Sequence, residues 1–149
     1  MKILPLSDLH GALPSLRDIP DCDLLLFAGD ICPDKRPEQQ LDWLAGDFRV
    51  WLEQLRQRNI RIVAIAGNHD FVFEKYAHYV EALGLPWTYL EDDETEVDGF
   101  RIWGTPWVPT FKNWAFCATD RQLEARSEII PDGIDILICH SPPYGGGLD

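Results

Sequence analysis

The chain has 149 residues, 46% of them hydrophobic and 26% charged, which fits one ordinary globular domain. A net charge of −12 argues against general binding to nucleic acid or to an anionic membrane, since both are polyanions. No apolar run approaches the roughly 18 residues that a membrane span needs. We therefore expect a cytoplasmic protein.

The predicted elements begin with strands. Four short apolar runs predict β-strands over residues 2–7, 23–28, 61–66 and 135–139. Near-continuous apolar runs are typical of parallel strands that are covered on both faces. Apolar residues at helical spacing and capping residues predict helices over 37–58, 73–83 and 119–129, and a short helical piece is allowed near 13–18.

The stretch 87–104 has a different pattern, which indicates antiparallel strands with a tight hairpin at Asp98-Gly99. The acidic run 91–94 is interpreted as a solvated turn rather than a calcium site, because it lacks a spaced ligand loop. Together the elements predict an α/β domain with a mostly parallel sheet and an antiparallel addition.

Polar side chains follow the four apolar runs of the predicted sheet. In open α/β sheets, ligands bind beyond the carboxyl ends of parallel strands. Each motif is weak alone, but the combination indicates a metal site. The candidate residues are Asp8 and His10 after the first run, Asp30 after the second, Asn68, His69 and Asp70 after the third, and His140 after the fourth.

The residue types also indicate which metals would bind. Oxygen and nitrogen donors without thiolate suit Mn²⁺, Fe or Zn²⁺ better than a lone Mg²⁺. Cys32 and Cys139 lie near these motifs, but we interpret them as small buried side chains in a reducing compartment. Gly29 and Gly67 are expected to let the backbone turn sharply where the ligands converge. His78, in a polar helix, is interpreted as a surface residue.

These motifs carry a resemblance. Asp8-x-His10, Gly29-Asp30, the Gly-Asn-His-Asp run at 67–70 and His140 resemble the calcineurin-like metallophosphoesterases. The stretches 103–116 and 130–149 resemble more closely the small metallophosphoesterase-domain-containing branch. The resemblance implies an α/β/β/α sandwich, two packed sheets flanked by helices.

The resemblance also implies a role for each candidate residue. Asp8 and His10 would bind one divalent ion, Asn68 and His140 a second, and Asp30 both. Manganese is expected first, with Fe or Zn²⁺ as alternatives. His69 would act as general acid, oriented by Asp70, while a metal-activated hydroxide attacks a small phosphate ester. Phosphodiesters, nucleotides among them, are the expected substrates.

The chain departs from the family pattern at its C-terminal end. The family continues to a Gly-His-x-His motif that supplies one more ligand to each metal, and 1–149 contains no such motif. We therefore expect a C-terminally truncated or naturally shortened domain with three protein ligands for each ion. We also expect an exposed sheet edge, through which two copies could form a homodimer.

Alternatives to the enzyme stay open. The missing ligands would fit a non-catalytic binding or interaction module, and a purely structural α/β domain is a further alternative. The aromatic loop 103–116 either packs the sheet onto the core, which we favour, or walls a substrate pocket. Gly145-Gly146-Gly147 is interpreted as a flexible tail and not as a phosphate-binding loop.

Overall fold

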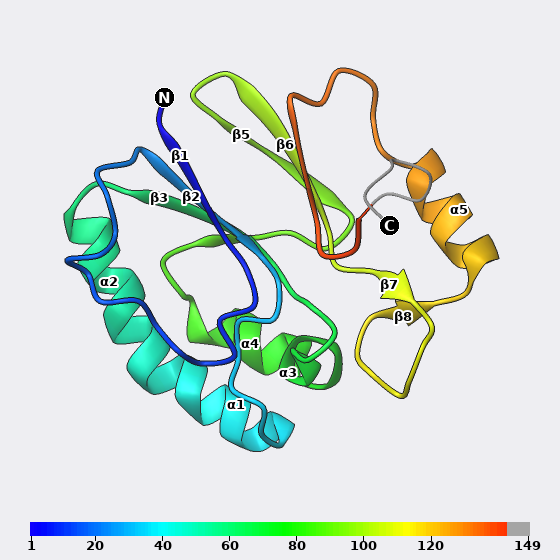
Figure 1. Ribbon diagram of the computed structural model, residues 1–149, viewed down its shortest axis with the longest axis horizontal. Helices are drawn as coiled ribbons and strands as arrows, with labels where there is room; N and C mark the ends of the chain where they lie inside the picture. The colour runs from blue at the N-terminus through cyan, green and yellow to red at the C-terminus, as the bar shows by residue number, and fades with distance from the viewer. Residues whose placement is uncertain (143–149) are drawn as a thin grey trace.

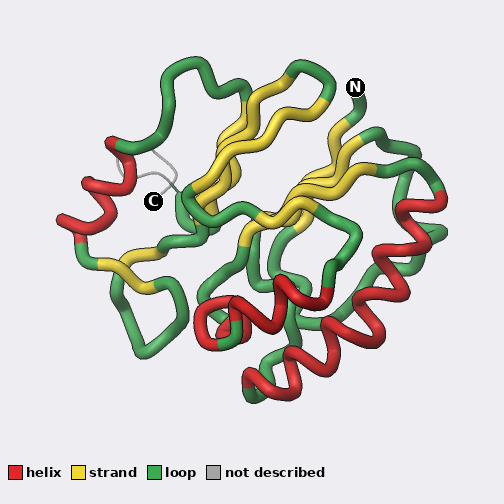
Figure 2. The backbone as a smooth tube through the Cα atoms, turned by 180° about the vertical axis from the view of Figure 1, so that it is seen from behind, coloured by secondary structure: helices red, strands yellow, loops and turns green. Residues whose placement is uncertain are grey.

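The computed structural model describes residues 1–142, which form two packed sheets with most of the helices on one side (Figures 1 and 2). The predicted glycine tail lies outside the described residues. The first sheet is all parallel, and its strands in spatial order are β1 (Ile3–Leu6), β2 (Leu24–Ala28), β3 (Arg61–Ile65) and β4 (Thr88–Tyr89). In the second sheet, β6 (Phe100–Thr105) pairs antiparallel with β5 (Asp93–Val97) and parallel with β9 (Ile136–Cys139). A small pair, β7 (Val108–Pro109) and β8 (Cys117–Ala118), completes the strands of the described region.

The helices confirm most of the predicted spans. The predicted helix over 37–58 runs through α1 (Pro37–Trp43), a π-helical turn (Leu44–Phe48) and α2 (Arg49–Gln57). The helix predicted over 73–83 begins earlier and is interrupted at Tyr76, which separates α3 (Phe71–Lys75) from α4 (Ala77–Leu83). Helix α5 (Asp120–Glu128) is confirmed, with Thr119 as its N-cap. The helices in the described part of the chain lack the length and apolar character that a transmembrane span requires.

The helical piece allowed near 13–18 is wrong, because that segment forms turns. The Ser15 carbonyl accepts a single turn bond from the Asp18 amide at 2.8 Å, whereas other carbonyl groups of this region bind side chains of the long helix. The Trp51 indole N–H donates to the Pro14 carbonyl at 2.9 Å, and the Arg58 guanidinium donates to the carbonyls of Leu16 and Ile19, both at 3.0 Å. These tertiary bonds take the acceptors that a helix would have used.

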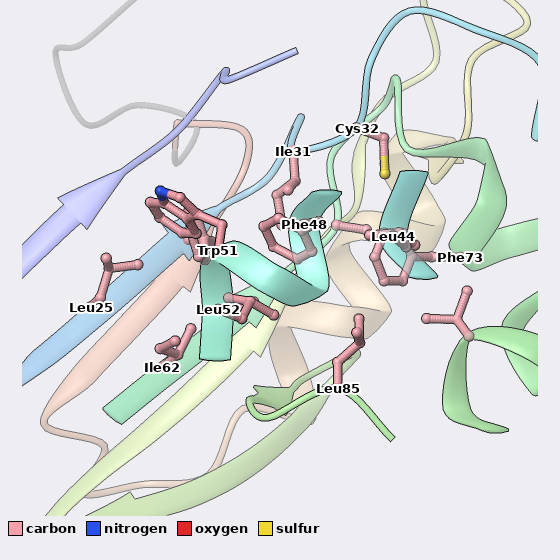
Figure 3. Packing of buried hydrophobic residues seen from close by; sticks show 14 of the residues in the cluster. Leu25, Ile31, Cys32, Leu44, Phe48, Trp51, Leu52, Ile62, Phe73 and Leu85 are labelled. Carbon is pink, nitrogen blue, oxygen red and sulfur yellow. The ribbon is translucent and has the colours of Figure 1, made fainter. Parts of the chain in front are cut away.

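Alternation along β2 and β3 explains why the first sheet is buried on both faces. Leu25 and Phe27 face the helices, where they pack with Phe48 and Leu52 in the larger core (Figure 3). Leu24 and Leu26, together with Val63 and Ile65 of β3, face the second sheet and contact Ile102 and Ile138 there. Side chains of a strand alternate between faces, so two strands supply both cores.

The region 87–104 only partly follows the prediction. The hairpin at Asp98-Gly99 is confirmed, and both residues have positive φ, 53° and 81°. The first piece, Thr88–Tyr89, is a parallel strand of the first sheet and not an antiparallel one. The prediction of a solvated turn is wrong for Asp92. Its carboxylate accepts hydrogen bonds from Thr105 Oγ1, the Trp107 indole and Arg126.

Candidate metal centre

The loops that follow β1 and β2 extend the pairing of those strands. The amide of Asp8 donates to the carbonyl of Gly29, and the amide of His10 donates to the carbonyl of Asp30, both at 3.0 Å. Asp8, His10 and Asp30 all have positive φ, of 55°, 44° and 51°. Non-glycine residues rarely adopt this conformation, and such strain concentrates at functional sites. Three of the predicted ligands are therefore held in unusual backbone geometry.

Asp30 occupies the middle of the predicted ligand set. Its side chain is buried, and Oδ1 accepts a hydrogen bond from the amide of His69 at 2.8 Å. Nε2 of His140 lies 3.4 Å from Oδ1, while Nε2 of His10 lies 3.6 Å from Oδ2. Burial disfavours the charged carboxylate, but the bonds from His140 and His69 outweigh it, so the pKa of Asp30 lies below its ordinary value. Asp30 thus presents one oxygen toward each of two histidines.

His140 is oriented by its backbone partner. Nδ1 lies 2.7 Å from the carbonyl of Ala28, a bond that puts the proton on Nδ1 and leaves Nε2 as the electron-pair donor. Nε2 faces Oδ1 of Asn68 at 3.0 Å. Burial alone would lower the pKa of His140, but the Asp30 carboxylate and the Ala28 carbonyl outweigh it and raise the pKa. An Nδ1 bound to a backbone carbonyl, with Nε2 free to donate its electron pair, is the arrangement that metal-binding histidines commonly have.

Asp34 is the residue that the sequence interpretation missed. Its Oδ1 lies 3.0 Å from Nδ1 of His10 and 2.8 Å from Nδ1 of His69. With Nδ1 of His10 bound there, Nε2 of that ring is left facing Asp30. Burial opposes ionisation, but the hydrogen bonds and charges of the two imidazoles together outweigh it and hold the pKa of Asp34 below its ordinary value. The available sequence signal was a second carboxylate four residues after Asp30, in the same loop.

The potential ligand atoms fall into two neighbouring groups. Asp8, Asp30 and His140 form one, and His10, Asp34 and His69 form the other, with the atoms of each group within 4.8 Å of one another. The structure therefore brings together all the predicted metal ligands, with Asn68 beside His140. The grouping differs from the expected one, because Asp8 lies with His140 and His10 lies with His69. The roles of these residues as ligands stay predictions.

Asp70 is close to the centre but faces away from the His69 ring. It is fully buried, and its carboxylate accepts hydrogen bonds from the amides of Ile31 (3.1 Å), Cys32 (2.7 Å) and Gly67 (2.8 Å). Burial raises the pKa of Asp70, and the three amide bonds oppose this without cancelling it. No hydrogen bond within residues 1–142 joins Asp70 to the imidazole of His69, which is bound by Asp34. Asp70 ties together the loops after β2 and β3.

Gly29 and Gly67 are needed at the centre for different reasons. Gly29 has a φ of 96°, which confirms the expected sharp turn. Gly67 has no such conformation, but a side chain there would overlap Asp30 and the ring of His140. The absence of Cβ at residue 67 lets the Asp30 carboxylate reach its place.

The aromatic loop packs the core at one end, as favoured, and contacts His69 at the other. Trp107 and Phe116 pack edge to face, with ring centroids 5.4 Å apart, and Phe116 is buried in the core. Trp114 instead lies beside His69, with ring centroids 5.4 Å apart, and the next residue donates its amide to the carbonyl of Asn68 at 3.0 Å. One end of the loop therefore packs the core, and the other forms a wall of the centre.

The donor set fits divalent transition metals. Carboxylates, imidazoles and one amide converge, and two of the histidines have Nδ1 bound so that Nε2 faces the Asp30 carboxylate. Burial raises the pKa of the Cys32 and Cys139 thiols, which agrees with their interpretation as thiols rather than thiolate ligands. Oxygen and nitrogen ligands without sulfur are those that Mn²⁺, Fe and Zn²⁺ accept.

Comparisons with a family model and with known proteins point to the same family. A family model described as calcineurin-like phosphoesterase matches residues 1–149. Metallophosphoesterase domain-containing protein 1 of Homo sapiens is 34% identical over 97% of this chain and 49% of its own length, and the Mus musculus protein of that name has the same values. A UPF0046 protein of Caenorhabditis elegans is 29% identical over 93% of this chain and 41% of its own length. The chain thus spans about half the length of these relatives.

Proposed function

Because the chain belongs to the calcineurin-like phosphoesterase family, we propose that it is a metal-dependent hydrolase of phosphate esters, and of phosphodiesters in particular. The observation that carries this proposal is the position of Asp30. One of its carboxylate oxygens faces Nε2 of His140 and the other faces Nε2 of His10. A carboxylate placed in this way can bind two cations at once.

The chain's own residues would hold two divalent ions, manganese by preference. Following the family resemblance, we assign Asp8, His10 and Asp30 to one ion and Asp30, Asn68 and His140 to the other, although the Asp8 carboxylate also lies within 4.8 Å of the nearest ligand atom of His140. When bound, the ions supply activation of water and neutralise charge on the phosphoryl oxygens. Asp8 and Asp30 contribute about two negative charges, so an anionic ester remains attractive to the loaded site.

His69 is proposed as the proton donor. Its Nδ1 is bound to Asp34, so Nε2 is the nitrogen available to the oxygen that leaves with the alcohol. The amide of the same residue is anchored on Asp30 at 2.8 Å, which fixes the ring next to the ligand set. Asp34 therefore acts as a positioning residue for His69.

Two features beside His69 support a diester as substrate. Trp114 lies against the ring and offers an aromatic face on which a nucleobase could stack. A hollow lined by Asp34, Phe71 and neighbouring residues opens beside the same histidine. A phosphate that carries two organic groups needs room for both.

The test is an assay of the purified chain, stripped of metal and then reloaded with Mn²⁺, on 4-nitrophenyl methyl phosphate, an activated phosphodiester. We expect turnover only with the metal. Because 4-nitrophenolate departs with little need of a proton, the His69→Ala variant is also assayed on phenyl methyl phosphate, whose poorer leaving group should make the loss about 100-fold or more, as for removal of a general acid. His78→Ala is the matched control, because His78 is exposed on α4 away from the centre.

Absence of any metal-dependent turnover, with metal binding retained, would overturn the enzyme assignment and favour a non-catalytic binding module. A His69→Ala protein that turns over as fast as the wild type would overturn the proposed role of His69 as proton donor.

A further inference from the structure

A hollow of about 600 Å³ opens beside His69. Its walls come from two segments far apart in the sequence, the loop into α1 with the first turn of that helix, and His69 with α3. The lining residues that matter here are Asp34, Lys35, Arg36, His69, Phe71 and Lys75. The hollow thus contains the proposed proton donor and its positioning residue.

The hollow is basic in a strongly acidic protein. The chain has 13 lysines and arginines against 25 acidic residues, and Lys35, Arg36 and Lys75 all line this one feature. None of the three belongs to an ion pair within residues 1–142, whereas other basic side chains do, Arg58, Arg61, Arg101 and Arg126 among them. The carboxylate that lines the hollow, Asp34, is directed to His10 and His69. The three cations outnumber the one lining carboxylate, so the hollow keeps an excess of positive charge for an outside anion.

Neighbouring groups offset only part of this charge. Glu38 accepts a hydrogen bond from the Tyr76 hydroxyl at 2.8 Å and interacts electrostatically with Arg36 and Lys75, but it does not line the hollow. The ammonium of Lys75 lies 5.3 Å from the centre of the Phe71 ring, a cation–π contact that places the charge on the wall of the hollow. A ligand there would meet both an apolar face and positive charge.

A buried glutamine holds the two walls together. Gln40 is fully buried, and its Nε2 donates to the carbonyls of Pro33 at 3.1 Å and His69 at 2.8 Å. Its Oε1 accepts the amide of Val72 at 3.0 Å. One side chain therefore links the loop before α1, the His69 loop and the start of α3. The hollow is a constructed feature of the fold and does not depend on surface side chains alone.

The hollow opens on the side of the centre where the leaving group is expected, next to His69. In the proposed function, His69 gives its proton to the oxygen that departs, so the departing alcohol lies on the His69 side of the phosphorus. We propose, on the basis of that function, that this hollow binds a second phosphate carried by the leaving group. The substrate class is then a phosphate ester whose departing alcohol is itself phosphorylated, as in a nucleotide-like bisphosphate.

The experiment compares two aryl methyl phosphodiesters whose phenols have matched pKa values. One phenol is neutral, and the other carries a methylenephosphonate, which mimics a phosphate but cannot be hydrolysed. We expect the wild-type chain to prefer the phosphonate ester about tenfold in kcat/KM at low salt, the size that a few exposed charge contacts provide. The variant Lys35→Gln/Arg36→Gln/Lys75→Gln should lose this preference, mainly through KM.

The matched control is Lys2→Gln/Arg17→Gln/Arg121→Gln, which removes the same charge from exposed positions that do not line the hollow. It should keep the preference. Equal loss in both triple variants, or no preference in the wild type, would overturn the subsite.

A separate binding arm distinguishes failure of the subsite from failure of the proposed function. The phosphonate-bearing phenol is titrated calorimetrically into each protein, with the neutral phenol as reference. Absence of turnover on both esters would overturn the proposed function alone. Tighter binding of the phosphonate phenol to the wild type than to the hollow variant would still support the subsite, and equal binding would overturn it.

Discussion

The Oδ1 atom of Asp34 lies 2.8 Å from Nδ1 of His69. The same oxygen is 3.0 Å from Nδ1 of His10, so one exposed carboxylate orients a proposed metal ligand and the proposed proton donor. Groups that orient metal-binding histidines typically contribute 10–100-fold to metal affinity or activity.

We therefore expect Asp34→Asn to lower Mn²⁺ affinity or turnover by about 10–100-fold, because the amide is a weaker acceptor for the two imidazoles. Metal titration followed by calorimetry and the diester assay measure the two effects separately. Asp42→Asn, at an exposed position on α1, is the charge-matched control. Values for Asp34→Asn equal to those of the control would contradict the positioning role.

Gln40 should be a stability determinant out of proportion to its size. Gln40→Ala leaves the carbonyl of His69 and the amide of Val72 without their partner, and we expect a loss of about 2–4 kcal/mol in the free energy of unfolding. Urea denaturation at neutral pH measures it. Gln54→Ala, exposed on α2, should change stability by less than about 0.5 kcal/mol. A similarly small effect at residue 40 would show that the buried bonds contribute little.

Gly67 should be required for metal binding, since any Cβ at this position overlaps Asp30. We expect Gly67→Ala to displace that carboxylate and to abolish measurable Mn²⁺ binding in calorimetry. Gly46→Ala is the control, because residue 46 lies in a helical turn with open space around it. That change should stabilise the protein by about 0.5–1 kcal/mol. Normal metal binding by Gly67→Ala would show that the centre tolerates the shift.

The hairpin turn provides a pH test. The hydrogen bond from Arg61 lowers the pKa of Asp98 below its ordinary value of 3.8. A lowered pKa in the folded state means that the pair stabilises the protein above about pH 4, and that this contribution is lost as pH falls through the folded pKa.

Asp98→Asn should therefore be less stable than the wild type at pH 7, with a difference that shrinks below about pH 4. Asparagine tolerates the φ of 53° at this position, so the turn itself is kept. Thermal melts between pH 7 and pH 2 give the comparison, with Glu96→Gln of the exposed face of β5 as control. A difference that stays constant over this range would place the effect in the turn and not in the ion pair.

The hairpin and the parallel strand β4 show which features the local sequence pattern can predict and which it cannot. Asp98-Gly99 was predictable because its turn depends on two residues with positive φ. The segment 88–89 was not, because its partner β3 lies more than twenty residues away and pairing in that direction leaves no local signal. The helix allowed near 13–18 failed for a related reason, since Trp51 and Arg58 take its carbonyls from a distance.

For the centre, the sequence by itself determined which candidate ligand residues the structure brings together. Asp8, Asp30, Asn68 and His140 each follow an apolar run, and strands that run parallel end at a common rim. Only the tertiary structure decided that Asp34 binds two histidines, that Asp70 binds backbone amides, and that Gln40 closes a basic hollow beside His69. Those contacts join loops that are about 25–40 residues apart, and packing and backbone turns, rather than spacing along the chain, bring them within hydrogen-bond distance.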